Sequence, residues 1–178
     1  MHSEHDYFEY LYNLATITIA FVGFAGLYIG FKTAGKMSKF DALITRNHFV
    51  LSFAVVGACL LPPLLSVALP WLPLGLHLQN KYWGVASGIA AIAPILFSLS
   101  YRRTRNRVTG NKMPTGNCVL LFLYFFGAAP LVFNAYENSA GLFVFGMTLQ
   151  QTINVLTFLY ALMYVLAVPE AGKKKGAQ

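Results

Sequence analysis

The chain has 178 residues, of which 57% are hydrophobic and 11% are charged, and its formal net charge is +7. A soluble globular domain carries about a quarter charged residues, so this composition excludes an ordinary soluble domain. The basic excess does not indicate nucleic-acid binding either, because the Lys and Arg residues flank apolar runs instead of forming one face with aromatic residues.

Five apolar runs follow one another, each close to or longer than the roughly 20 residues that a helix needs to cross a bilayer. A membrane β-barrel would show short alternating segments, which these runs do not. The sequence therefore predicts an all-α bundle of five transmembrane helices in a single domain, residues 1–168, followed by a disordered basic tail, residues 169–178. The predicted spans are 7–31, 40–69, 82–101, 117–135 and 141–168.

The charges between the runs predict the orientation of the bundle. Twelve of the 13 Lys and Arg residues fall on one side, in or beside the first connection, the third connection and the tail. The other side has Lys81 together with Glu4, Asp6, Glu9 and Glu137. Because cytoplasmic loops are the ones rich in Lys and Arg, we expect the N-terminus outside and the C-terminus in the cytoplasm. The basic side is then expected to contact anionic lipids.

The first run is preceded by an acidic segment, and it contains small residues at helical spacing. The segment M-H-S-E-H-D-Y-F-E matches no closed zinc pattern, so we expect a flexible, solvated end and no metal. Small residues let helix backbones approach closely in lipid, where apolar side chains gain nothing by association. The close-packing glycines expected here and in the third run serve either packing within one bundle or an interface between copies; they are Gly23, Gly26, Gly30, Gly84 and Gly88.

A polar cluster, Arg46, Asn47 and His48, lies two turns into the second run. Arg46 is expected to extend its guanidinium to the lipid headgroups. His48 lies deeper in the run, where it is either a hydrogen-bonded structural residue or a proton sensor.

The last run contains Gln150, Gln151, Asn154 and Thr157, a polar stripe that is costly to expose to acyl chains. The stripe must therefore face protein, water or a ligand. Three interpretations remain open: hydrogen bonds between helices, the lining of a polar cavity or pore, and contact with a cofactor. Asn13 and Thr16 of the first run are candidate partners, provided that the first and last helices are neighbours.

No motif for an enzyme occurs in the sequence, which lacks a metalloprotease helix, a nucleophile elbow, a Walker loop and a dinucleotide turn. We expect no catalytic role, no cofactor and no metal. The architecture resembles that of small bacterial inner-membrane proteins, a likeness that transfers no residue role. Two functions remain: an oligomeric channel or permease-like protein for a small neutral or weakly charged solute, and a non-catalytic accessory, assembly or sensory subunit of a larger membrane complex.

Overall fold

The computed structural model describes residues 3–33, 39–71, 79–109 and 115–167, and within these ranges it contains helices and no strand. The prediction of an all-α protein is confirmed. The tail predicted to be disordered lies outside the described residues. The elements are α1 (Glu4–Thr33), α2 (Lys39–Ala68), the 3-10 turns η1 (Leu69–Trp71) and η3 (Gln79–Lys81), α3 (Tyr82–Thr109), α4 (Thr115–Glu137) and α5 (Ala140–Ala167).

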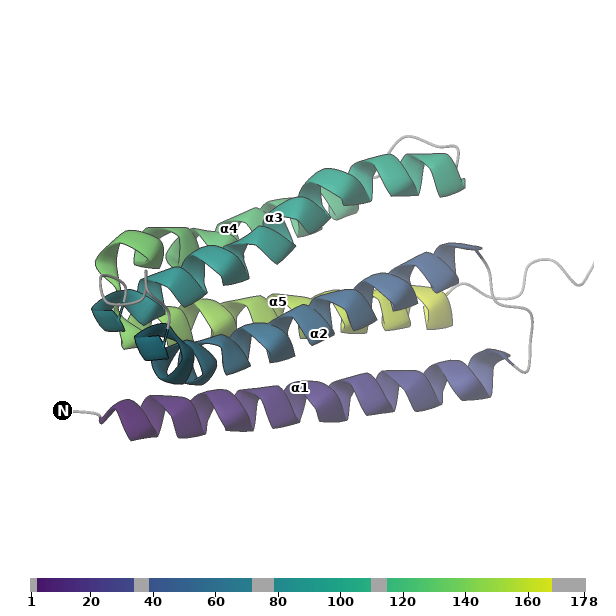
Figure 1. Cartoon of the computed structure of the whole chain (residues 1–178). Coiled ribbons are helices and arrows are strands. Elements are labelled where there is room, and N and C mark those ends of the chain that lie inside the picture. The colour runs from purple at the N-terminus through teal and green to yellow at the C-terminus, as the bar shows by residue number, and fades with distance from the viewer. Residues whose placement is uncertain (1–2, 34–38, 72–78, 110–114, 168–178) are drawn as a thin grey trace, which may run out of the picture.

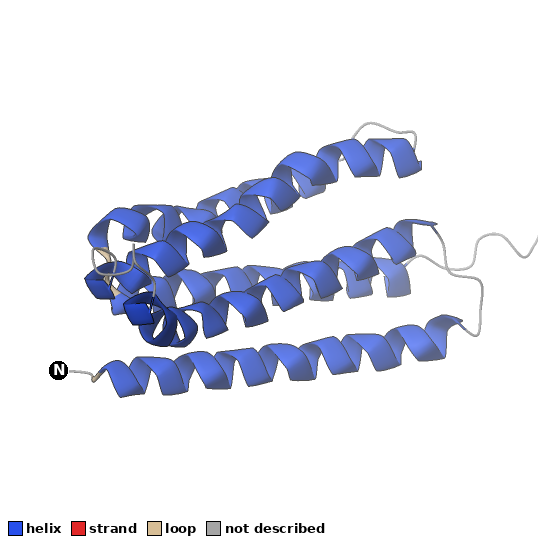
Figure 2. Cartoon of the chain, in the orientation of Figure 1, coloured by secondary structure: helices blue, strands red, loops and turns tan. Residues whose placement is uncertain are grey.

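The third helix is longer than the sequence indicates. Its apolar part ends near Tyr101, but α3 continues to Thr109 through the arginine-rich segment (Figure 2). Arginine is a strong helix former, so the charged segment extends the helix although it ends the apolar run.

The five helices run side by side in an up-and-down arrangement, with α3 packed most extensively against α4 and α1 packed against α2 and α5 (Figure 1). The start of α1 and the end of α5 lie at opposite ends of the bundle. We call one end the acidic end, where Glu4, Asp6, Glu9 and Glu137 lie. The other is the basic end, where α2 begins close to Arg46 and α3 finishes in its arginines.

Within the described residues, three helices are long and apolar enough to cross a membrane, over Glu4–Leu27, Thr45–Trp71 and Ala140–Tyr160, and Tyr82–Phe97 is a shorter apolar stretch. The surface is also apolar. Large side chains are exposed on every helix, among them Phe24, Phe53, Leu96, Phe126, Phe133 and Phe145. Apolar patches of this extent are rare on soluble monomers, whereas they suit contact with acyl chains. The chain is therefore described as a helical membrane protein.

Aromatic side chains fill the core near the acidic end. Trp83 is 4% exposed, and its ring lies 5.5 Å from that of Phe8 and 5.6 Å from that of Phe143, measured between centroids. Ser3 caps α1, because its Oγ accepts from the backbone N–H of Asp6 and the Asp6 carboxylate accepts from the Ser3 N–H. The acidic segment expected to be flexible is thus helical from Glu4 onward.

The glycines predicted to pack closely fall into two groups. A Cβ on Gly84 would lie 3.0 Å from the carbonyl oxygen of Ala135, and one on Gly88 would lie 3.9 Å from the Ala135 Cβ, so both serve the contact between α3 and α4. Gly26 faces α2, where the Phe49 ring lies 3.8 Å from its Cβ position.

In contrast, Gly23 is exposed and has no atom within 4 Å of its Cβ position, so it packs against nothing within the bundle. Gly30 lies in α1, but its surroundings are outside the described side chains. Two close contacts between α4 and α5 were not anticipated. A Cβ on Gly127 would lie 2.6 Å from Ile153, and one on Gly146 would lie 2.7 Å from Leu131.

Candidate functional site

The polar stripe of α5 faces the interior of the bundle. Gln150 and Gln151 are each 5% exposed, Asn154 is 1% exposed, and Thr157 is half-buried. This orientation keeps the amides away from acyl chains, where unpaired donors and acceptors are costly. The helix thus follows the rule for membrane bundles, in which polar side chains connect helices.

Asn154 is the centre of a hydrogen-bonded group that joins α5 to α2. Its Nδ2 donates to Ser52 Oγ at 2.9 Å, and its Oδ1 lies 3.2 Å from Nδ1 of His48. Because an amide oxygen only accepts, Nδ1 of His48 is the donor, and Nε2 of a neutral ring is left as an acceptor. The imidazole also stacks on Phe158, with 4.4 Å between ring centroids. His48 is therefore held in place by two contacts with α5.

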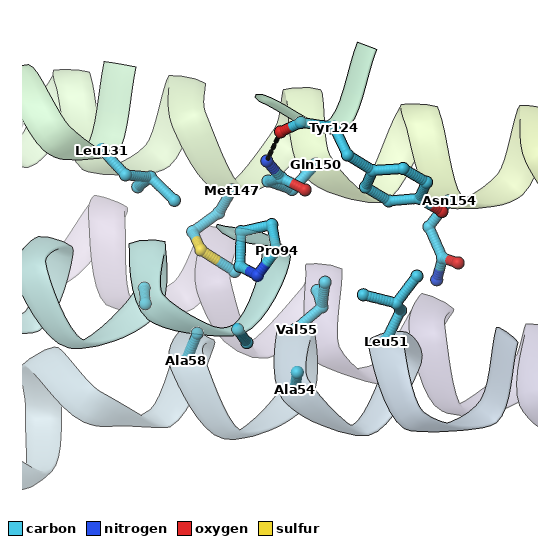
Figure 3. A pocket seen from close by; sticks show the side chains of 12 residues that line it. Leu51, Ala54, Val55, Ala58, Pro94, Tyr124, Leu131, Met147, Gln150 and Asn154 are labelled. Carbon is cyan, nitrogen blue, oxygen red and sulfur yellow. Dashed lines mark hydrogen bonds between the residues drawn. The ribbon is translucent and has the colours of Figure 1, made fainter. Parts of the chain in front are cut away.

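Gln150 connects α5 to α4 instead. Its Nε2 donates to the backbone carbonyl of Tyr124 at 3.3 Å (Figure 3). Gly127 makes this contact feasible, because a Cβ there would lie 2.9 Å from Gln150 Nε2. A primary amide close to a neighbouring backbone needs such a residue without a side chain.

Several buried polar atoms of this region have no hydrogen-bond partner. They are Asn47 Nδ2, His48 Nε2, the Tyr124 hydroxyl and both amide atoms of Gln151. Thr157 lies beside the Tyr124 hydroxyl, but the Thr157 hydroxyl donates to the carbonyl of Ile153 at 2.7 Å. The two hydroxyls do not form a hydrogen bond with each other. In hydrocarbon, each such group costs several kcal/mol unless water or a ligand bonds to it.

A cavity of about 20 Å³ lies between α2, α3, α4 and α5. Its wall is apolar except for Tyr124, Gln150 and Asn154, whose side chains Figure 3 shows together on one side. A water molecule needs roughly 10–15 Å³ measured in this way. The cavity therefore has room for a single water and not for a larger solute.

Two prolines add acceptors near this cavity. A proline has no N–H, so the carbonyl four residues earlier lacks its usual helical donor. For Pro62 of α2 that carbonyl belongs to Ala58, and for Pro94 of α3 it belongs to Ala90. Both alanines line the cavity. The polar side chains of the cavity wall come from α4 and α5, and the two prolines leave one carbonyl of α2 and one of α3 without its usual helical donor.

A second polar group, at the acidic end, is fully bonded. Asn134 of α4 donates to Ser87 Oγ of α3 at 2.8 Å and accepts from the Ser139 N–H at 2.7 Å. Asn138 has a φ of 54°, a left-handed conformation that Asn tolerates, and it forms the turn between α4 and α5. Its Oδ1 accepts from the N–H of Gly84 at 2.8 Å, and its Nδ2 donates to the carbonyl of Asn80 at 2.6 Å. We call these hydrogen-bonded residues the acidic-end clasp; they are Asn80, Gly84, Ser87, Asn134, Asn138 and Ser139.

The candidate partners of the stripe on α1 lie elsewhere. Asn13 and Thr16 are exposed, and Thr16 donates to the carbonyl of Tyr12 in its own helix. The first and last helices are neighbours, and a hydrogen bond of 2.9 Å joins Tyr10 to Thr148 between them. The structure therefore does not bring Asn13 to the stripe, because Asn13 points away from the interior.

At the basic end, Arg46 is exposed, as a side chain that reaches the headgroups must be, while Asn47 is half-buried beside it. Among the described residues, no three His, Cys, Asp or Glu side chains lie close enough to hold a metal ion. Cys59 is buried and unpaired.

Comparison with family models, curated proteins and solved structures finds no match for this chain.

Sequence reasoning missed Ser52, Tyr124, Ser87, Asn134 and Asn138. Asn134 lies in the apolar segment L-V-F-N-A, so the cost of a buried amide that marks Asn154 applies to it equally. Asn138 follows a long apolar run and precedes another, a place where asparagine commonly ends a helix. Ser and Tyr in apolar runs carry no comparable signal, because Ser hydroxyls often bond within their own helix.

Proposed function

We propose that this chain is a multi-pass protein of the bacterial inner membrane that acts as a channel or permease-like protein for a small neutral or weakly charged solute. The observation that carries the proposal is the cavity at the level of Gln150, the midpoint of Ala140–Tyr160. Transporter sites lie near the bilayer midplane, where interrupted helices offer free backbone carbonyls. Pro62 and Pro94 lie inside two of the cavity's helices, and each lacks the N–H that would bond to the carbonyl four residues earlier.

The polar groups in the wall favour a neutral solute. No Asp or Glu occurs from residue 42 to 136 or from 138 to 169. A fully charged ion entering the cavity would meet no opposite charge, and its desolvation would remain uncompensated. A molecule with a few hydrogen-bond donors and acceptors would instead exchange its bonds with water for bonds with Gln150 and Asn154.

The orientation is part of the proposal. The basic end carries Arg46 and the arginines of α3, and the acidic end carries Glu4 and Glu137. Positively charged loops stay on the cytoplasmic side, so the basic end is placed in the cytoplasm, in contact with anionic lipids.

We further propose that the chain associates in the membrane, as a homo-oligomer or within a larger complex. A cavity of about 20 Å³ does not pass a solute larger than water, so transport requires either separation of the helices or a path between subunits.

A flux assay tests the proposal. Proteoliposomes containing the protein are mixed with hyperosmotic urea or glycerol, and light scattering reports entry of water and solute. Gln150→Leu and Asn154→Leu each remove hydrogen bonds of about 1–2 kcal/mol, so we expect flux to fall about tenfold. Thr152→Leu, on the exposed face of α5, is the matched control and should leave flux unchanged. Flux that is absent, or that survives both interior substitutions, contradicts the proposal.

The second candidate is a non-catalytic subunit of a larger membrane complex, and one observation favours it. Asn13, Thr16, Ala20 and Gly23 form an exposed polar and small-residue face on α1. The amide of Asn13 would gain hydrogen bonds from a partner helix that lipid cannot supply. Native mass spectrometry of protein extracted under mild conditions distinguishes the candidates. Foreign subunits in fixed ratio support the accessory role, and an assembly of copies of this chain alone supports the channel. A monomer contradicts the proposed association.

A further inference from the structure

The buried polar groups are distributed unevenly along the bundle. In the described part of the chain, every buried side-chain nitrogen or oxygen that lacks a partner belongs to Asn47, His48, Tyr124 or Gln151. These residues lie at the level of the cavity or nearer the basic end. The acidic-end clasp, in contrast, uses both amide groups of Asn134 and of Asn138.

From this asymmetry we infer a one-sided aqueous path: water reaches the cavity from the basic end only. We call Asn47, His48, Tyr124, Gln151 and Thr157 the polar path. The inference deepens the proposed function and rests on it for the assignment of the basic end to the cytoplasm.

The groups of the polar path point to water as the ligand. Tyr124 and Gln151 are 2% and 5% exposed, and His48 is 4% exposed, so none reaches bulk solvent by itself. Together they offer a hydroxyl donor, an imidazole acceptor and an amide that both donates and accepts. Buried waters make about three hydrogen bonds to such otherwise unsatisfied groups. None of the five residues of the polar path is a carboxylate, so the path itself suits neutral molecules and not metal cations.

The position of Tyr124 connects the path to the cavity. Its backbone carbonyl accepts from Gln150 in the cavity wall, and its hydroxyl lies beside Thr157, two turns further toward the basic end. In Figure 3 the ring runs along α5 from Gln150 toward Asn154. A water bonded to the hydroxyl is therefore positioned between the cavity and the basic end.

Large apolar side chains close the cavity on its other side. Leu131 and Met147 line it and are 0% and 2% exposed, and Phe143, one turn nearer the acidic end, is 0% exposed. The backbone of Gly146 is so close to Leu131 that a Cβ there would lie 2.7 Å from its Cδ2 atom. Beyond this packing, Ser87 and Asn134 bond to each other, and among the described residues no buried side-chain nitrogen or oxygen of the acidic-end clasp is left without a partner.

Two serines provide a matched test. Ser52 and Ser87 are both 0% exposed, and each accepts a hydrogen bond from an asparagine. Ser52 lies beside the polar path, whereas Ser87 belongs to the acidic-end clasp. Each is replaced by cysteine in a background with Cys59→Ala and Cys118→Ala. Vesicles of both orientations are treated with a small neutral methanethiosulfonate reagent, and glutathione trapped inside quenches any reagent that crosses the membrane. Only a thiolate reacts, and it forms only where water reaches the sulfur.

We expect Ser52→Cys to react at least about tenfold faster than Ser87→Cys, because a buried thiol in apolar surroundings stays protonated. The reaction should occur from the side of the basic end only. Thr157→Cys, a half-buried position on the path, should show the same preference and replaces Ser52→Cys if that variant does not fold. Equal rates, a faster reaction of Ser87→Cys, or no reaction at either path position would overturn the inference.

The outcome is separable from that of the proposed function. Fast labelling of Ser52→Cys without solute flux supports the aqueous path and contradicts transport. Flux by a protein whose path positions resist the reagent supports transport and contradicts the path.

Discussion

Asn154 and Gln151 lie one turn apart on α5 and are almost equally buried, but their surroundings predict opposite consequences of truncation. Asn154→Ala removes the bonds to Ser52 and His48 and leaves both partners buried without a substitute. At about 0.6–2 kcal/mol for each interhelical bond in a membrane, the expected loss is roughly 1–4 kcal/mol. Gln151→Ala removes a longer side chain, but one whose amide bonds to no protein group. We expect it to change the free energy of unfolding by less than about 1 kcal/mol.

The assay is reversible unfolding in mixed micelles by increasing fractions of sodium dodecyl sulfate, followed by the fluorescence of Trp83. This ring is 4% exposed in the core, and Trp71, which is 85% exposed, is replaced by phenylalanine to leave one reporter. The double variant with Ser52→Ala provides the control, because it should cost much less than the sum of the two single losses. If Gln151→Ala costs as much as Asn154→Ala, the assignment of hydrogen bonds on α5 is wrong.

Three further predictions use the same unfolding assay. Gly84→Ala should cost about 1–3 kcal/mol because its Cβ would meet a carbonyl of α4 at 3.0 Å, whereas Gly23→Ala, at a position with open space, should stay within about 0.5 kcal/mol of the parent. Equal effects would place Gly23 in a packed contact. Asn138→Ala should lower the free energy of unfolding by about 2–4 kcal/mol, because it removes two hydrogen bonds and strains a φ of 54°. Asn138→Gly should lower it by less, since glycine adopts this φ without strain. The reverse order would show that backbone strain is unimportant here. Gly146→Ala should cost about 1–3 kcal/mol, and combining it with Leu131→Ala should be less destabilising than the sum, which strict additivity would contradict.

The number of helices follows from the sequence because run length and the thickness of hydrocarbon determine it together. The residues at which the helices end are predicted less accurately. The arginines after Tyr101 end the apolar run, but they continue α3 to Thr109, since hydropathy reports the surroundings of a residue and not its backbone conformation. Five spans are expected from the sequence. Two of them, residues 82–101 and 117–135, are not among the three helices whose described residues are long and apolar enough to cross a membrane.

The interior position of Asn154 also follows from the sequence, because an amide in hydrocarbon must find partners. The sequence does not predict which residues become the hydrogen-bond partners of Asn154. Asn13 is a chemically suitable partner on a neighbouring helix, but the rotation of α1 points it outward, and Ser52 and His48 of α2 take its place. Helix rotation depends on the packing of all five helices, which periodicity within one run does not contain.

The glycines illustrate the same limit. Gly23 and Gly84 lie in comparable stripes of small residues, but Gly84 packs against α4 and Gly23 faces outward. Gly146 makes one of the closest helix contacts without belonging to a recognisable stripe. Whether two helices approach closely depends on both of the surfaces that face each other, and the sequence of one apolar run describes only one of these surfaces.

The central claim is that the exposed apolar surface faces lipid while the polar groups lie inside. The most direct measurement places one tryptophan on α4 by Phe126→Trp, at a side chain that is 59% exposed, with Trp71 and Trp83 replaced by phenylalanine. Lipids brominated near the end of the acyl chain should quench its fluorescence strongly, and aqueous iodide should not. Quenching by iodide together with insensitivity to the brominated lipid would show that α4 faces water, and the membrane-spanning bundle would be wrong.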